Sequence, residues 1–162
     1  MLDTFFERHL RFSMAIDHVL VPMDGSPLSK QALTIAFEEY PDAKITVLHV
    51  IDPTQPGYSY PTELDLDTEP LHGSEEWYER SEELAEELFG EVNALAEERD
   101  REVLTELTVG EPGREIVEFA ADADVDQIVI GSHGRDDEDE SFLGSVTETV
   151  VFRSPVRVLL VR

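Results

Sequence analysis

Short runs of β-branched and other apolar residues alternate along the chain with longer stretches in which apolar residues recur every three or four positions. The first pattern is typical of buried strands and the second of amphipathic helices. Strands are predicted at residues 18–22, 44–50, 102–109, 127–130 and 156–161. Helices are predicted from Ser26 onward, over about 74–99, from Pro112 onward and over about 145–152. Because parallel neighbours need crossover connections, this alternation predicts an α/β fold: an open parallel sheet with helices on both faces.

Two segments do not fit the alternation. Residues 52–73 are rich in proline, and a connection of this length is expected to be functional, mobile or both. Residues 1–13 form no clear element, and we interpret Met14 as the natural start of a single domain at 14–162. The stretch 1–13 is then an over-called extension. The alternative is a real extension whose phenylalanines dock on the domain or on a partner.

Acidic residues outnumber basic ones by 37 to 12, which gives a formal net charge of −25. Such a charge argues against nucleic acid as a direct partner, because duplex binding needs clustered lysine and arginine. Self-repulsion destabilises a compact chain at low ionic strength, whereas in molar salt the Debye length falls to about 3 Å. We interpret the composition as that of a protein from a salt-accumulating halophile. The alternative is an ordinary acidic protein of a mesophile.

The rest of the composition narrows the location and the chemistry. The absence of cysteine excludes disulfides, thiolate metal sites and cysteine nucleophiles. No apolar run is long enough to cross a membrane. The N-terminal stretch lacks the apolar core of a signal peptide, which favours a cytoplasmic location. The motifs GxxxxGK[ST], GxSxG and HExxH are absent and the histidines show no metal spacing, so no catalytic residue is predicted.

Glycines gather around the fourth predicted strand. Gly131 follows the strand directly, Gly134 comes three positions later, and Gly144 with Ser145 opens the last helix. Glycine lets a phosphate group approach the backbone closely, and a helix N-terminus offers free N–H groups to an anion. The combination predicts a phosphate-binding cradle.

Two other strand ends are expected to lie near this cradle, because ligands bind at the carboxyl ends of strands in open α/β sheets. Asp24 follows the first strand and could accept hydrogen bonds from a ribose; the alternative is a capping acid at a strand–helix junction. Val50 ends the second strand and could offer main-chain groups and an apolar wall to a purine. His49, within the same apolar strand, is interpreted as a core histidine rather than a ligand or a base.

The stretch 21–26, the strand residues 48–50, the sequence Gly-Glu-Pro at 110–112 and the glycine cradle resemble the universal stress protein family, in its ATP-binding form. The resemblance covers roughly residues 16–162. It implies the adenine-nucleotide alpha-hydrolase-like fold, with a five-stranded parallel sheet of order 3-2-1-4-5. It also implies ATP, with Mg²⁺, as the ligand.

Carried over residue by residue, the resemblance implies a nucleotide site and a dimer interface. The expected nucleotide-binding residues are Pro22, Asp24, Val50, Ile130, Gly131, Gly134, Gly144, Ser145 and Val146. The family forms homodimers by antiparallel pairing of the last strand, here around Val156, Val158 and Leu160. Physical reasoning agrees, because an apolar strand at the edge of a sheet needs cover.

One departure from the family pattern concerns the spacer between the cradle glycines, where residues 136–140 are five consecutive acids. Two like charges about 6 Å apart repel by roughly 2–3 kcal/mol at an effective dielectric constant of 20. The run is interpreted as halophilic decoration of an exposed loop. The alternatives are that it recruits a cation, or that ATP binding has been lost.

Three functional hypotheses follow. The first is an ATP-binding universal stress protein that acts as a dimeric stress-response sensor or regulator, with at most slow or incidental hydrolysis. The second is a dimeric interaction module of the same fold that uses no nucleotide. The third is an enzyme of this architecture, such as an adenylyl-transferring or ATP-hydrolysing domain.

Overall fold

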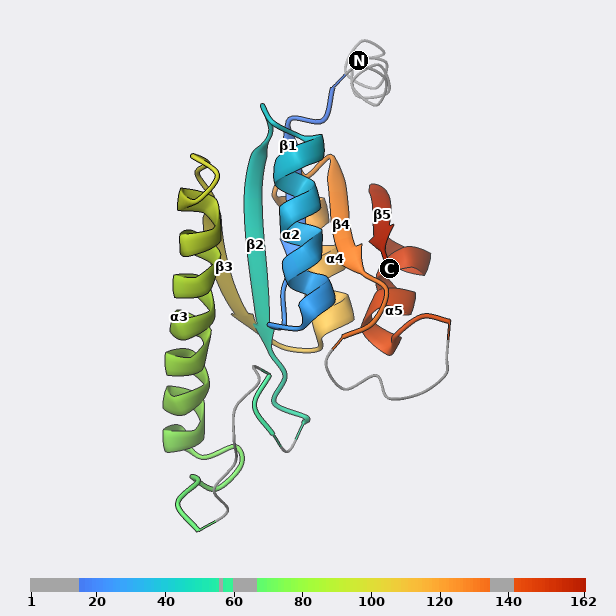
Figure 1. Cartoon of the computed structure of the whole chain (residues 1–162). Helices are drawn as coiled ribbons and strands as arrows, with labels where there is room; N and C mark the ends of the chain where they lie inside the picture. Colours follow the sequence, from blue (N-terminus) through green and yellow to red (C-terminus); the bar gives the residue numbers. More distant parts are fainter. Residues whose placement is uncertain (1–14, 56, 60–66, 135–141) are drawn as a thin grey trace.

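The computed structural model describes residues 15–55, 57–59, 67–134 and 142–162, which form alternating strands and helices (Figure 1). The strands are β1 (His18–Pro22), β2 (Lys44–Ile51), β3 (Leu104–Val109), β4 (Gln127–Gly131) and β5 (Arg157–Val161). The helices are α2 (Pro27–Glu39), α3 (Glu75–Glu97), α4 (Pro112–Asp122) and α5 (Ser145–Arg153). The predicted N-terminal extension and the acidic run at 136–140 lie outside the described residues. None of the helices described is long and apolar enough to cross a membrane.

All five strands are parallel and form one sheet of order β3-β2-β1-β4-β5, so the predicted topology is confirmed. Val19 of β1 lies beside Ile45 of β2 on one side and Gln127 of β4 on the other. The chain winds to one side of β1 through β2 and β3, and to the other side through β4 and β5. The switch point of the topology therefore lies between β1 and β4, where α/β folds place their ligands.

Two hydrophobic clusters cover opposite faces of the sheet, because successive side chains of a strand point to opposite sides. Val19 and Val21 pack with residues of α2 and α3, whereas Leu20 packs with residues of α4 and α5. Figure 1 shows α2 in front of the sheet and α4 behind it. Each strand of the sheet centre is thus buried on both sides, as its uninterrupted apolar sequence requires.

The observed strand and helix boundaries differ from the predicted ones by at most two residues, and those of β1 agree. The largest strand shift is at β3, which begins at Leu104 rather than at residue 102. Arg101 explains it, because its guanidinium donates hydrogen bonds to the carbonyls of Phe37 and Tyr40 and holds the chain at the end of α2. The ladder with β2 therefore starts where Leu104 meets Thr46.

Candidate functional site

A cavity of about 290 Å³ opens at the carboxyl edge of the sheet, over the switch point between β1 and β4. Its walls come from the ends of β1, β2 and β4, from the first turns of α2, α4 and α5, and from the segment that follows β2. The lining residues are Pro22, Met23, Asp24, Ser26, Ser29, Leu48, His49, Val50, Asp52, Gln55, Tyr58, Ser59, Pro112, Ile116, Ile130, Gly131, His133, Gly134, Ser145, Val146 and Thr147.

The fold brings most of the sequence-predicted site residues to this one cavity. Those in the lining are Pro22, Asp24, Val50, Ile130, Gly131, Gly134, Ser145 and Val146. Gly144 is outside the lining, and its N–H donates to the carbonyl of Ser132 at 2.8 Å. The backbone N–H of Gly144 is therefore engaged within the protein, in contrast to the expectation that it faces an anion.

The first turn of α5 forms the cradle side of the cavity. Its N-cap residue, Gly144, supplies no side-chain hydrogen bond to the helix, whereas Ser26 caps α2 through its hydroxyl. The first N–H groups of an α-helix have no partner within the helix, so they concentrate partial positive charge at this end. Ser145 and Val146 lie in that turn and line the cavity. This helix end is therefore chemically suited to an anionic group.

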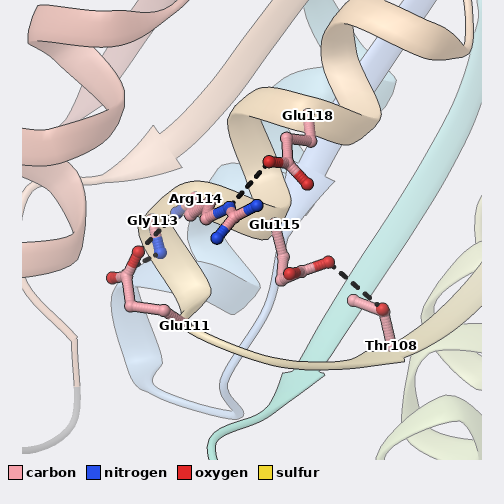
Figure 2. Close-up of polar contacts among 6 residues, drawn as sticks. All are labelled: Thr108, Glu111, Gly113, Arg114, Glu115 and Glu118. Carbon is pink, nitrogen blue, oxygen red and sulfur yellow. Dashed lines mark hydrogen bonds and ion pairs between the residues drawn. The ribbon is translucent and has the colours of Figure 1, made fainter.

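The N-terminus of α4, on the same side of the sheet as α5, is capped by a side chain of the protein (Figure 2). The Glu111 carboxylate accepts hydrogen bonds from the N–H of Gly113 at 3.1 Å and of Arg114 at 2.7 Å. These donors are already bonded to an anionic side chain, so α4 contributes Pro112 and Ile116 to the cavity as an apolar wall. Glu111 thus caps α4, whereas the N-cap residue of α5, Gly144, makes no side-chain hydrogen bond to its helix.

Buried contacts fix the cradle to the end of β4. Thr147 is 3% exposed, and its hydroxyl donates to the carbonyl of Gly131 at 2.8 Å. Gly131 also approaches α2 so closely that a Cβ at this position would lie 2.8 Å from the Cβ of Leu28. Only glycine fits here without a shift of α2, which is the physical reason for this residue at the end of the strand.

The loop after β1 holds Asp24 at the opposite side of the cavity. Gly25 adopts a φ of +79°, and the N–H of Ser26 donates to Asp24 Oδ1 at 2.9 Å. The carboxylate therefore supports the turn and also lines the cavity, whereas the cap of α2 is Ser26 and not Asp24, as the alternative interpretation had it. His49 is buried as predicted, and its Nδ1 donates to the carbonyl of Met23 at 2.7 Å. This contact fixes the backbone immediately before Asp24.

The segment that follows β2 supplies a wall that sequence reasoning did not assign. The N–H of Asp52 donates to Ser59 Oγ at 2.9 Å, and Asp52 Oδ1 accepts from Thr54. Tyr58 is 4% exposed and donates from its hydroxyl to Glu69. Burial, and then the Glu69 carboxylate, raise the pKa of Tyr58 to about 12, so the hydroxyl stays protonated. Proline content indicated a loop here but gave no sign of which side chains turn inward.

The described lining is acidic in composition. Its ionisable side chains are Asp24, Asp52, His49, His133 and Tyr58, and the described lining contains no lysine or arginine. Nowhere in the described part of the chain do three or more His, Asp or Glu side chains gather into a metal site. A polyphosphate here would depend on backbone N–H groups and on a cation that arrives with it.

The chain belongs to the universal stress protein family, whose family model matches residues 15–162. Universal stress protein MJ0531 of Methanocaldococcus jannaschii is 34% identical over 149 residues, which cover 89% of this chain and 81% of the relative. Universal stress protein MJ0577 of the same organism is 33% identical over 157 residues, which cover 93% of this chain and 97% of the relative.

Solved structures agree on the fold. Universal stress protein UspA from Lactobacillus plantarum superimposes with a TM-score of 0.72 at 22% identity, covering 93% of this chain and all of that one. A universal stress protein in complex with cAMP gives a TM-score of 0.63 at 24% identity, covering 92% of this chain and 99% of that one. At these identities the likeness establishes the architecture alone.

Proposed function

We propose that this protein is an ATP-binding universal stress protein that acts as a dimeric sensor or regulator of the stress response. The observation that carries the proposal is the cavity at the β1–β4 switch point, which gathers eight of the nine predicted nucleotide residues. Other proteins of this fold have been solved with cAMP, with AMP and with dAMP, all of which contain an adenine base and phosphate.

The cavity offers distinct surroundings for the parts of a nucleotide. Pro22 and Val50 provide apolar surface for the base, and the Asp24 carboxylate is an acceptor for ribose hydroxyls. The uncapped start of α5 and the glycines at 131 and 134 provide N–H groups for the phosphates. Mg²⁺ would be held by the phosphates and by water, the usual arrangement for this ion in nucleotide sites.

The dimer is proposed to form through β5. This strand pairs only with β4 among the described strands, so it forms one edge of the described sheet. Val156, Val158 and Leu160 are half-buried and pack toward the cluster under α4 and α5. Pairing of two β5 strands would therefore use backbone hydrogen bonds, with apolar support from Phe152 of α5, which is 80% exposed.

Among the described residues that line the cavity, none is a lysine or arginine that could contact a transferring phosphoryl group, so we propose binding without efficient turnover. Slow or incidental hydrolysis is compatible with this role. Occupancy of the pocket, rather than product formation, would then carry the signal.

Calorimetric titration of ATP, ADP and AMP in molar KCl with Mg²⁺ tests the proposal. Asp24→Ala should weaken binding at least tenfold, whereas Asp122→Ala, an exposed acid at the end of α4, should not. Far-UV circular dichroism checks that both variants fold. No heat with any adenine nucleotide, in the presence of Mg²⁺ and salt, would refute nucleotide binding.

The second candidate is a dimeric interaction module of the same fold that binds no nucleotide. The absence of lysine and arginine among the described lining residues favours it, as does the acidic run at 136–140 in the sequence. It predicts that no nucleotide is released from the purified protein on denaturation and that the dimer forms regardless of ATP. Mass spectrometry of released small molecules separates the two candidates.

A further inference from the structure

Tyr58 belongs at once to the wall of the cavity and to a separate aromatic cluster. It lines the cavity, and its ring stacks on that of Trp77 with a centroid distance of 5.9 Å and an interplanar angle of 13°. Ile51, Tyr58, Trp77 and Leu84 form a buried cluster distinct from the two that cover the sheet. One side chain thus connects the ligand space with the start of α3.

Residues 69–74, just before α3, also contact the cluster. Glu69 accepts the hydrogen bond of the Tyr58 hydroxyl, and the His72 ring meets the edge of Trp77 at a centroid distance of 4.9 Å. Ser74 then caps α3, because its hydroxyl accepts from the N–H of Trp77 at 3.1 Å. Figure 1 shows the segment after β2 and the first turn of α3 at the same end of the molecule.

These contacts make the cavity wall and the segment 67–74 depend on one another. Tyr58 has little freedom of its own, since it is buried between them and hydrogen-bonded at its far end. A ligand that packs against Tyr58 therefore favours the arrangement in which the ring also stacks on Trp77. By linkage, if the ligand stabilises that stacking, an interaction that stabilises the stacking strengthens the ligand's binding in return.

We propose that Tyr58 is a positioning residue that couples nucleotide occupancy of the cavity to the packing of residues 67–74 and the first turn of α3. The coupling rests on the proposed function. It identifies residues 67–74 and the first turn of α3 as the part of the surface whose packing changes when a nucleotide binds. It gives the long loop a defined task. Tyr58 and Ser59 contribute to the wall, and residues 67–74 respond through Glu69 and through the contact of His72 with Trp77.

Trp77 is the only tryptophan in the sequence, so its fluorescence reports on this cluster alone. With the full chain in molar KCl and Mg²⁺, saturating ATP should change the Trp77 emission and reduce its quenching by acrylamide. The midpoint of this change should equal the dissociation constant from calorimetry. In Tyr58→Phe the ring is kept and the bond to Glu69 is lost, and the emission change should shrink.

Glu69→Gln tests the coupling from outside the cavity, because Glu69 is not in its lining. We expect ATP affinity to fall about fivefold or more, within the usual range of coupling between sites. Loss of an acidic charge by itself would strengthen binding of an anion, so a weakening has the opposite sign to a pure charge effect. Glu79→Gln, an exposed residue of α3 with the same charge change, is the matched control.

Three outcomes decide the matter. Weakened binding in Glu69→Gln and Tyr58→Phe, with Glu79→Gln at the wild-type affinity, supports the coupling. If the wild type binds ATP but its Trp77 emission does not change and both variants bind as the control does, the coupling is refuted and nucleotide binding stands. If the wild type binds no adenine nucleotide, the proposed function fails and the coupling fails with it.

Discussion

Replacing Thr147 by valine tests whether the cradle depends on the bond between α5 and the end of β4. Valine keeps the branched shape of the buried side chain but removes the hydroxyl that donates to Gly131. A hydrogen bond of this kind contributes about 1 kcal/mol net, and up to about 3 kcal/mol when its loss leaves the buried carbonyl without another donor. We therefore expect the free energy of unfolding to fall by about 1–3 kcal/mol.

Thr149→Val is the control, two residues further along the same helix. Its hydroxyl donates to the carbonyl of Ser145 within α5 and is partly exposed, so its loss should cost less than about 0.5 kcal/mol. Urea unfolding followed by far-UV circular dichroism in molar KCl measures both variants. Thr147→Val should also bind ATP several-fold more weakly, because the turn that holds Ser145 and Val146 loses its side-chain bond to the end of β4 and keeps only the backbone bond from Gly144 to Ser132. Equal stability of the two variants, or unchanged ATP affinity in Thr147→Val, would refute this reasoning.

Three further predictions concern stability. Gly113→Ala should destabilise the protein by about 1–3 kcal/mol despite its better helix propensity, since its Cβ would lie 2.7 Å from Thr149 Cγ2. The cost should shrink in a Thr149→Ser background, measured by urea unfolding. Burial, and then the Lys44 ammonium, lower the pKa of His18 in the folded protein. As the pH drops below the ordinary value of 6.5, the His18 imidazole therefore takes up a proton more readily in the unfolded chain than in the folded one. Unfolding free energy should fall as the pH drops through that value, and less so in His18→Gln. Finally, the urea midpoint should rise from about 0.2 to 2 M KCl as the charge of −25 is screened; a flat midpoint would contradict the halophilic interpretation.

Strand positions were predictable because the central strands are buried on both faces and read as continuous apolar runs. β1 was predicted at its observed bounds for this reason. The helix starts were predictable from local chemistry, since Ser26 and Ser74 cap α2 and α3 through their hydroxyls. The start of β3 was missed, because Arg101 holds the preceding chain through contacts with residues about sixty positions away.

The residues of the candidate site also fall into two groups, those that a local sequence pattern indicates and those that it does not. Glycines and acids at strand ends carry a local signal, which is why most of the predicted residues meet in the cavity. Tyr58 and Thr147 carry none, because a tyrosine in a proline-rich loop and a threonine in a helix are both ordinary. Gly144 shows the converse, since its position indicated an anion contact, but its N–H is bonded to Ser132.

The sequence by itself determined the class of fold, the family and the strand ends at which a ligand is expected, because burial and turn chemistry act over a few neighbouring residues. Only the tertiary structure decided how the start of α5 and the long loop enter the cavity wall. Ser145 and Val146 at the start of α5 line the same cavity as Tyr58, and Tyr58 stacks on Trp77 nineteen positions further on. These contacts depend on the packing of whole elements against one another, and no local pattern encodes them.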